Sequence, residues 1–163
     1  MTPKELLTDM LLPNLEMMKM TIADFSEADM LVRPTPAANH AAWQLGHLAV
    51  AESHLVNMFQ PGAVPEIPAA FMAKFTKETS KVNDPAAFPK KAELLDALTN
   101  ARLATIAWAK GLSDADLAKP GPEKMKGFAP TIGHLIAMTP CHTMMHVGQF
   151  QVIRRALGKP VIF

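Results

Sequence analysis

The chain is short of several features that mark whole classes of protein. Its 163 residues contain one cysteine, Cys141, which excludes an intrachain disulfide and leads us to expect a cytoplasmic location. Charge of one sign is not in excess, because 16 Lys and Arg nearly balance 15 Asp and Glu, and this argues against a nucleic-acid partner. No apolar run approaches the roughly 18 residues of a membrane span. Because Lys4 and Glu5 interrupt the N-terminal segment, we expect no signal peptide and a soluble protein without membrane contact.

Hydrophobic residues are abundant in the chain and recur with the period of an α-helix. The hydrophobic share of 49% is ample for one buried core, so we expect a single domain over residues 1–163. Apolar residues recur at three- and four-residue steps in four long segments, and no segment alternates with the period of a strand. The expected helices cover about residues 2–25, 39–60, 90–110 and 131–157. The pattern predicts an all-α four-helix bundle.

The sequence contains signals for where these helices begin, break and end. Thr2 and Glu5 form a capping-box pattern with Pro3 at the first helical position. Pro13 lies inside the first helix and predicts a kink or a split there. The proline-rich stretch 61–89 is too poor in apolar residues to separate two cores, so we interpret it as a long crossover between helices two and three.

Two histidines four residues apart are the most informative feature of helix four. His142 and His146 lie about 40° apart around the helix and one turn along it, so both imidazoles can reach one metal ion. His47 occupies an apolar stretch of helix two and can complete a three-nitrogen site with an open position for water or substrate.

The expected bundle seams turn these histidines toward a shared interior. The seam of helix four consists of Met138, His142, Met145, Gln149, Val152 and Ala156, and that of helix two of Trp43, His47, Val50 and His54. Burying an unsatisfied polar group costs about 1 to 3 kcal/mol, and a divalent cation would satisfy three imidazoles at once. The alternative is that they are core histidines with other partners.

Several further residues have two readings each. Gln149 shares the azimuth of His142 and either orients an imidazole or a metal-bound water, or fixes the helix register. Cys141 is interpreted as a small core residue, with a reactive thiol as the alternative. Arg102, Arg154 and Arg155 are interpreted as solvated or paired, with contact of one of them to an anionic substrate group as the alternative.

The remaining histidines are not expected to be ligands. His134 lies about 120° around the helix from His146, and His54 lies about 10 Å along the helix from His47. His40 is expected at the start of helix two.

Three segments resemble the DinB/YfiT-like superfamily. They are residues 43–48, with the sequence WQLGHL, residues 112–117, LSDADL, and residues 142–149, HTMMHVGQ, followed by RRALG at 154–158. The resemblance implies an up-down-down-up four-helix bundle, often dimeric, that binds zinc or nickel through three histidines. Matched by position, these are His47, His142 and His146. Relatives often have Glu directly after the first histidine of the pair, where this chain has Thr143, and Glu52 and Glu27 are the nearest acidic candidates.

Such relatives include thiol-dependent S-transferases and a maleylpyruvate isomerase. The leading hypothesis is therefore a metal-dependent enzyme, a hydrolase or a thiol transferase, that activates water or a low-molecular-weight thiol for attack on a small-molecule substrate. The catalytic residues, and a general base among them, are not identified, and a homodimer is expected by analogy. The alternatives are a non-catalytic bundle that binds a metal or ligand, and a structural bundle with core histidines.

Overall fold

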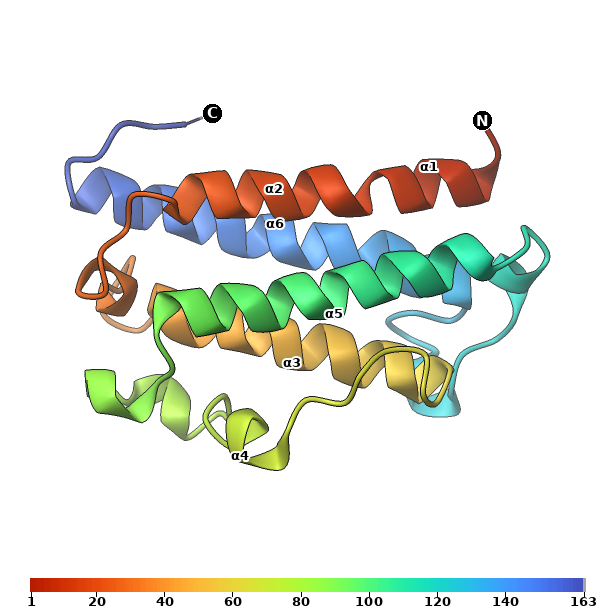
Figure 1. Ribbon diagram of the computed structural model, residues 1–163, viewed down its shortest axis with the longest axis horizontal. Helices are drawn as coiled ribbons and strands as arrows, with labels where there is room; N and C mark the ends of the chain where they lie inside the picture. The colour runs from red at the N-terminus through yellow and green to blue at the C-terminus, as the bar shows by residue number, and fades with distance from the viewer. Residues whose placement is uncertain (163) are drawn as a thin grey trace.

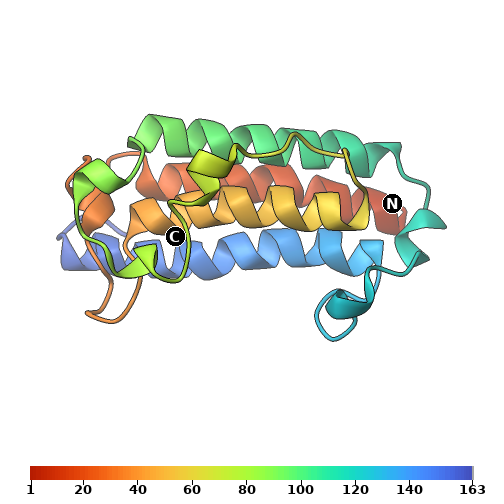
Figure 2. The ribbon, with the colours of Figure 1, turned by 90° about the horizontal axis from the view of Figure 1, so that it is seen from below.

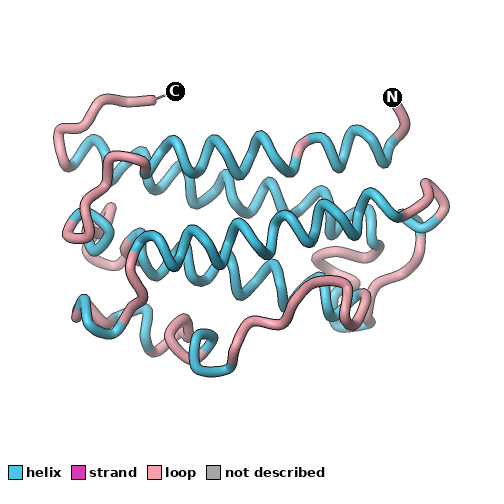
Figure 3. Tube along the Cα trace, in the orientation of Figure 1, coloured by secondary structure: helices cyan, strands magenta, loops and turns pink. Residues whose placement is uncertain are grey.

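The computed structural model describes residues 1–162, and these are helical with no β-strand (Figures 1 and 3). The helices are α1 (Pro3–Asp9), α2 (Leu11–Ile22), α3 (Ala41–Phe59), α4 (Ala69–Met72), α5 (Lys91–Gly111) and α6 (Ile132–Ala156). Short 3-10 turns occupy the connections, among them Asp116–Ala118 after α5. The all-α prediction is confirmed for this part of the chain. None of these helices has the length and hydropathy to cross a lipid bilayer.

The long helices pack side by side as a bundle (Figures 1 and 2). In Figure 1, α1 and α2 follow one another from right to left, α3 and α5 run from left to right, and α6 returns to the left. The closest pairings are α3 with α5 and α2 with α6. The segment between α3 and α5 carries the chain back along the bundle and contains α4.

The first helix is split, and the position of the split follows from Pro13. Thr2 caps α1 with the expected capping box, in which its hydroxyl accepts from the Glu5 N–H. The helix breaks at Met10, three residues before the proline. Pro13 has no N–H to donate to the Asp9 carbonyl and its ring crowds that group, so α1 ends at Asp9. Pro13 then lies in the first turn of α2, where a missing donor costs little.

The buried face of α6 differs from the predicted seam. Met145 is 67% exposed and Val152 is 42% exposed, whereas Thr143, His146 and Phe150 are buried. The prediction was wrong because α6 has no Lys, Arg, Asp or Glu between residues 132 and 153, so charge does not mark its outer face. On α3, the predicted seam residue His54 is likewise exposed.

His40 starts α3 as an N-cap. Its Nδ1 accepts from the Trp43 N–H at 3.1 Å, and its Nε2 lies 3.1 Å from the Val82 carbonyl oxygen, which fixes the proton on Nε2. The side chain is fully buried. Burial lowers the pKa of His40 to about 4, and the nearby positive charge of Arg33 acts in the same direction.

This burial predicts a pH-dependent stability. Between pH 6.5 and 4 the unfolded chain binds a proton at His40 and the folded chain does not, so stability is lost as the pH falls through this window. We expect the unfolding free energy of wild type to fall by on the order of 3 kcal/mol more than that of His40→Asn over this range. Urea titrations at a series of pH values measure this. The control is His134→Asn, which alters an exposed histidine, and parallel curves for wild type and His40→Asn would contradict the prediction.

Candidate metal centre

Three imidazoles converge between the middle of α3 and the middle of α6. Each of His47, His142 and His146 offers a ring nitrogen, and these nitrogens lie within 4.8 Å of one another. The Nε2 atoms of His142 and His146 are 3.2 Å apart. Two imidazoles on one tetrahedral zinc ion place their nitrogens about 3.3 Å apart, so this pair already has the spacing of a chelate. The histidine donor set therefore fits a borderline cation such as zinc or nickel.

The environment keeps these imidazoles neutral, which is the form that binds metals. Burial, together with charge repulsion from the neighbouring His142 and His47, lowers the pKa of His146 to about 3. Burial likewise lowers the pKa of His47 to about 4. The pKa of His142 is lowered by burial and by Arg102, against an opposing effect of Glu52. At neutral pH each ring therefore has a lone pair to donate.

A buried amide orients His146. The Gln44 side-chain oxygen lies 2.6 Å from His146 Nδ1, so Nδ1 carries the proton and Nε2 faces the cluster with its lone pair. Gln44 is itself fully buried, and its amide nitrogen donates to the Asn39 carbonyl. No role was predicted for Gln44 from the sequence. Its position three residues before His47, inside an apolar run, was the available signal.

The predicted orienting residue, Gln149, lies elsewhere. It is half-buried on α6, and within the described residues no hydrogen bond joins its side chain to an imidazole. Its role stays a prediction.

Trp43 holds His47 from the other side. The indole and imidazole rings are stacked, with centroids 4.9 Å apart and 9° between their planes. The indole N–H donates to the Thr76 carbonyl at 3.2 Å and to the Thr79 hydroxyl at 3.3 Å. His47 is therefore linked through Trp43 to the crossover.

The crossover also presses against the backbone of α3 at Gly46. A Cβ atom at Gly46 would lie 2.0 Å from a ring carbon of Phe75. We expect Gly46→Ala to lower the unfolding free energy by about 1 to 3 kcal/mol, because the buried Phe75 ring must move. The control is Gly148→Ala on α6, which meets nothing within 4 Å and is expected to stabilise the helix by about 1 kcal/mol. Equal denaturation midpoints for the two variants would contradict this account.

The acidic candidate Glu52 belongs to a buried network beside the cluster. Arg102 Nε donates to the two Glu52 oxygens at 2.8 and 3.1 Å, and its Nη2 donates to Glu52 at 2.9 Å and to the Thr143 hydroxyl at 2.9 Å. Glu52 lines a small pocket with Leu48, Leu55, Met138, Thr139, His142 and Thr143. Arg102 is paired, which was one of its two interpretations. The second acidic candidate, Glu27, lies beside the start of α5, where it accepts from the Lys91 N–H.

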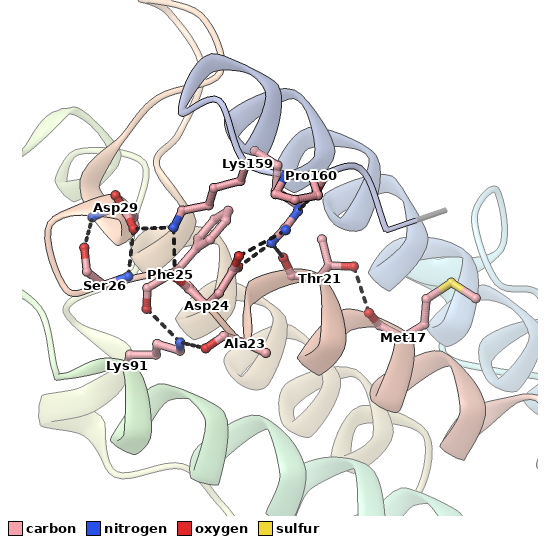
Figure 4. A network of polar contacts seen from close by, with 11 residues as sticks. Met17, Thr21, Ala23, Asp24, Phe25, Ser26, Asp29, Lys91, Lys159 and Pro160 are labelled. Atoms are coloured by element: carbon pink, nitrogen blue, oxygen red, sulfur yellow. Dashed lines mark hydrogen bonds and ion pairs between the residues drawn. The ribbon is translucent and has the colours of Figure 1, made fainter.

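Other candidates lie away from the cluster. Cys141 is exposed, so its interpretation as a core residue was wrong. The sequence misled here because no charged residue marks the outer face of this part of α6. His134 is exposed and interacts with Thr131 in the first turn of α6. Arg154 is paired with Asp24. Asp24 and Lys159 belong to a network of polar contacts at the end of α2 (Figure 4).

Fold and cluster together define an all-helical bundle with three convergent histidines. The chain belongs to the DinB superfamily, whose family model matches residues 13–150. This confirms the resemblance inferred from the motifs. No curated protein matches the chain.

Two solved structures are similar. One is a conserved protein from Enterococcus faecalis, 18% identical, with a TM-score of 0.72 and coverage of 98% of this chain and 99% of that one. The other is YfiT from Bacillus subtilis, described as a probable metal-dependent hydrolase with an unusual four-helix bundle topology. It is 15% identical, with a TM-score of 0.67 and coverage of 96% of this chain and 89% of that one.

Proposed function

We propose that the protein is a metal-dependent enzyme in which His47, His142 and His146 hold one divalent cation, zinc or nickel, for reaction with a small-molecule substrate. The observation that carries this proposal is the convergence of three neutral ring nitrogens within 4.8 Å. Membership of the DinB superfamily and the similarity to YfiT support the same function.

Residues around the proposed site have separate roles. Gln44 presents the Nε2 of His146, and Trp43 holds the ring of His47. The pocket beside His142, which Leu48, Leu55 and Met138 line on its apolar side, has room for about one water molecule. When bound, a divalent cation supplies a Lewis acid that makes water or a thiol nucleophilic near neutral pH.

Two reaction classes fit this site. Hydrolysis is supported by the similarity to YfiT. Transfer to a low-molecular-weight thiol is favoured by the fact that Glu52 is occupied by Arg102, which leaves this carboxylate poorly suited as a general base. A thiol ionises far more readily than water, with a pKa near 8.5 against 15.7, and depends less on such a base.

Metal analysis separates the proposal from a bundle with structural histidines. Protein purified without a His tag is expected to contain close to one equivalent of zinc or nickel and to melt at a lower temperature after chelation. Less than about one-tenth equivalent, with melting unchanged by added metal or by chelation, would remove the proposal.

An activity screen separates an enzyme from a non-catalytic binding module. Electrophiles are offered with glutathione, bacillithiol or mycothiol, and ester and amide substrates are offered in water. Turnover by wild type that is lost in His142→Ala is expected. A protein that binds metal and turns over none of these compounds would favour the binding module.

We also propose the finer architecture implied by the family, an up-down-down-up bundle with its crossover between α3 and α5. The helix directions in Figures 1 and 2 support it. The homodimer and the cytoplasmic location are proposals on family analogy and on the cysteine count respectively. Light scattering on the purified protein tests the first.

A further inference from the structure

One arginine connects all four long helices. Arg102 on α5 is fully buried, and its guanidinium donates to partners on the other three. The partners are the Leu11 carbonyl on α2, the Glu52 carboxylate on α3 and the Thr143 hydroxyl on α6. A guanidinium is planar and its donors point in fixed directions, so it constrains the relative positions of its acceptors.

These contacts lie beside the three histidines. Thr143 follows His142 directly and precedes His146 by three residues, so it belongs to the same turn of α6 as the pair. Glu52 lies five residues after His47, about 7.5 Å along α3. Arg102 therefore joins the two helices that carry the histidines, close to the level of the cluster.

The Arg102 contacts have most effect on the relative position of α3 and α6. α3 packs more extensively on α5 than on α6, and α6 packs more extensively on α2. The histidines nevertheless have to converge across the α3–α6 gap. The Arg102 contacts, made from α5, therefore constrain the relative position of α3 and α6, which direct packing between these two helices constrains only weakly.

We propose that Arg102 is a positioning residue for the three-histidine cluster, setting α6 against α3 through its simultaneous contacts with Thr143 and Glu52. This inference rests on the proposed metal site and adds to it a residue that would not itself bind the cation. The role predicts that loss of the Arg102–Thr143 contact weakens metal binding beyond any general loss of stability.

The test uses conservative variants. Thr143→Val keeps the shape of the side chain and removes the acceptor, whereas Thr143→Ser keeps the hydroxyl. Thr105→Val is the matched control, because Thr105 is also buried, bonds to the carbonyl four residues before it as Thr143 does, and forms no hydrogen bond with Arg102. We expect the zinc Kd of Thr143→Val to rise by about 10- to 100-fold, the range for loss of an outer partner of a metal site. Thr143→Ser and Thr105→Val are expected to stay within about threefold of wild type.

A second measurement reads the helix positions without metal. Spin labels are placed on the exposed native Cys141 of α6 and on His54→Cys of α3, and their distance distribution is measured by pulsed electron resonance. We expect Thr143→Val to broaden or shift this distribution, and Thr105→Val to leave it unchanged.

The outcomes separate this inference from the proposed function. If wild type binds zinc and Thr143→Val binds it equally well, the positioning role is overturned while the metal site stands. An equal loss of zinc affinity in Thr143→Val and Thr105→Val would assign the effect to lost stability and would also overturn the positioning role. If wild type binds no zinc, the proposed function fails and the inference fails with it, whatever the spin-label distances show.

Discussion

Replacing His146 with alanine is expected to lower zinc affinity by more than about a hundredfold, which exceeds the loss produced by removing an outer partner of a metal site. His146 is buried, its Nδ1 is already bound by Gln44, and its Nε2 faces the Nε2 of His142 at 3.2 Å. Its orientation is set before any ligand arrives. The variant therefore loses both a donor and the preorganised geometry of the chelate.

Competition with a chelator of known affinity measures this change. Trp43 provides a second readout, because a paramagnetic cation such as Ni²⁺ beside the stacked His47 ring is expected to quench its fluorescence. His134→Ala is the control, since it removes an exposed histidine from the first turn of the same helix. Equal affinities in wild type and His146→Ala would contradict the assignment of His146 as a ligand.

Breaking the Arg102–Glu52 pair is expected to have the largest effect on stability. The exposed fractions of these two side chains are 0% and 4%, and Glu52→Gln leaves the guanidinium charge buried without its counterion. Removal of one partner of a buried pair costs about 3 to 5 kcal/mol. In a chain of this size, a loss of 1 kcal/mol lowers the melting temperature by roughly 2 to 4 °C.

Two controls distinguish the buried charge from other causes. Glu123→Gln breaks an exposed pair with Lys126 and is expected to change stability by less than about 0.5 kcal/mol. The double variant Glu52→Leu with Arg102→Met removes both charges and is expected to recover much of the loss. A double variant less stable than Glu52→Gln would show that the charges were not the main cause.

Helix positions could be predicted from the sequence because short-range signals set them. The capping box at Thr2, the proline at Pro13 and the glycine at Gly158 act over a few residues. α3 and α5 begin and end within two residues of the expected limits. The two histidines of the pair were predictable for the same reason, since a four-residue spacing on a helix is local geometry.

The rest depended on contacts between distant residues. Arg102 and Glu52 are 50 positions apart, and either could have been solvated, so their pairing is visible only after the helices pack. Gln44 reaches His146 across 102 positions for the same reason. Exposure of Met145 went unpredicted because both faces of α6 are apolar or weakly polar.

We propose that three histidines from two helices hold one cation. Anomalous diffraction from crystals grown with zinc, collected on both sides of the zinc absorption edge, tests it most directly. We predict one strong peak about 2.0 to 2.2 Å from a ring nitrogen of each of His47, His142 and His146. Full-occupancy zinc bound elsewhere, with no peak among these three rings, would contradict the account.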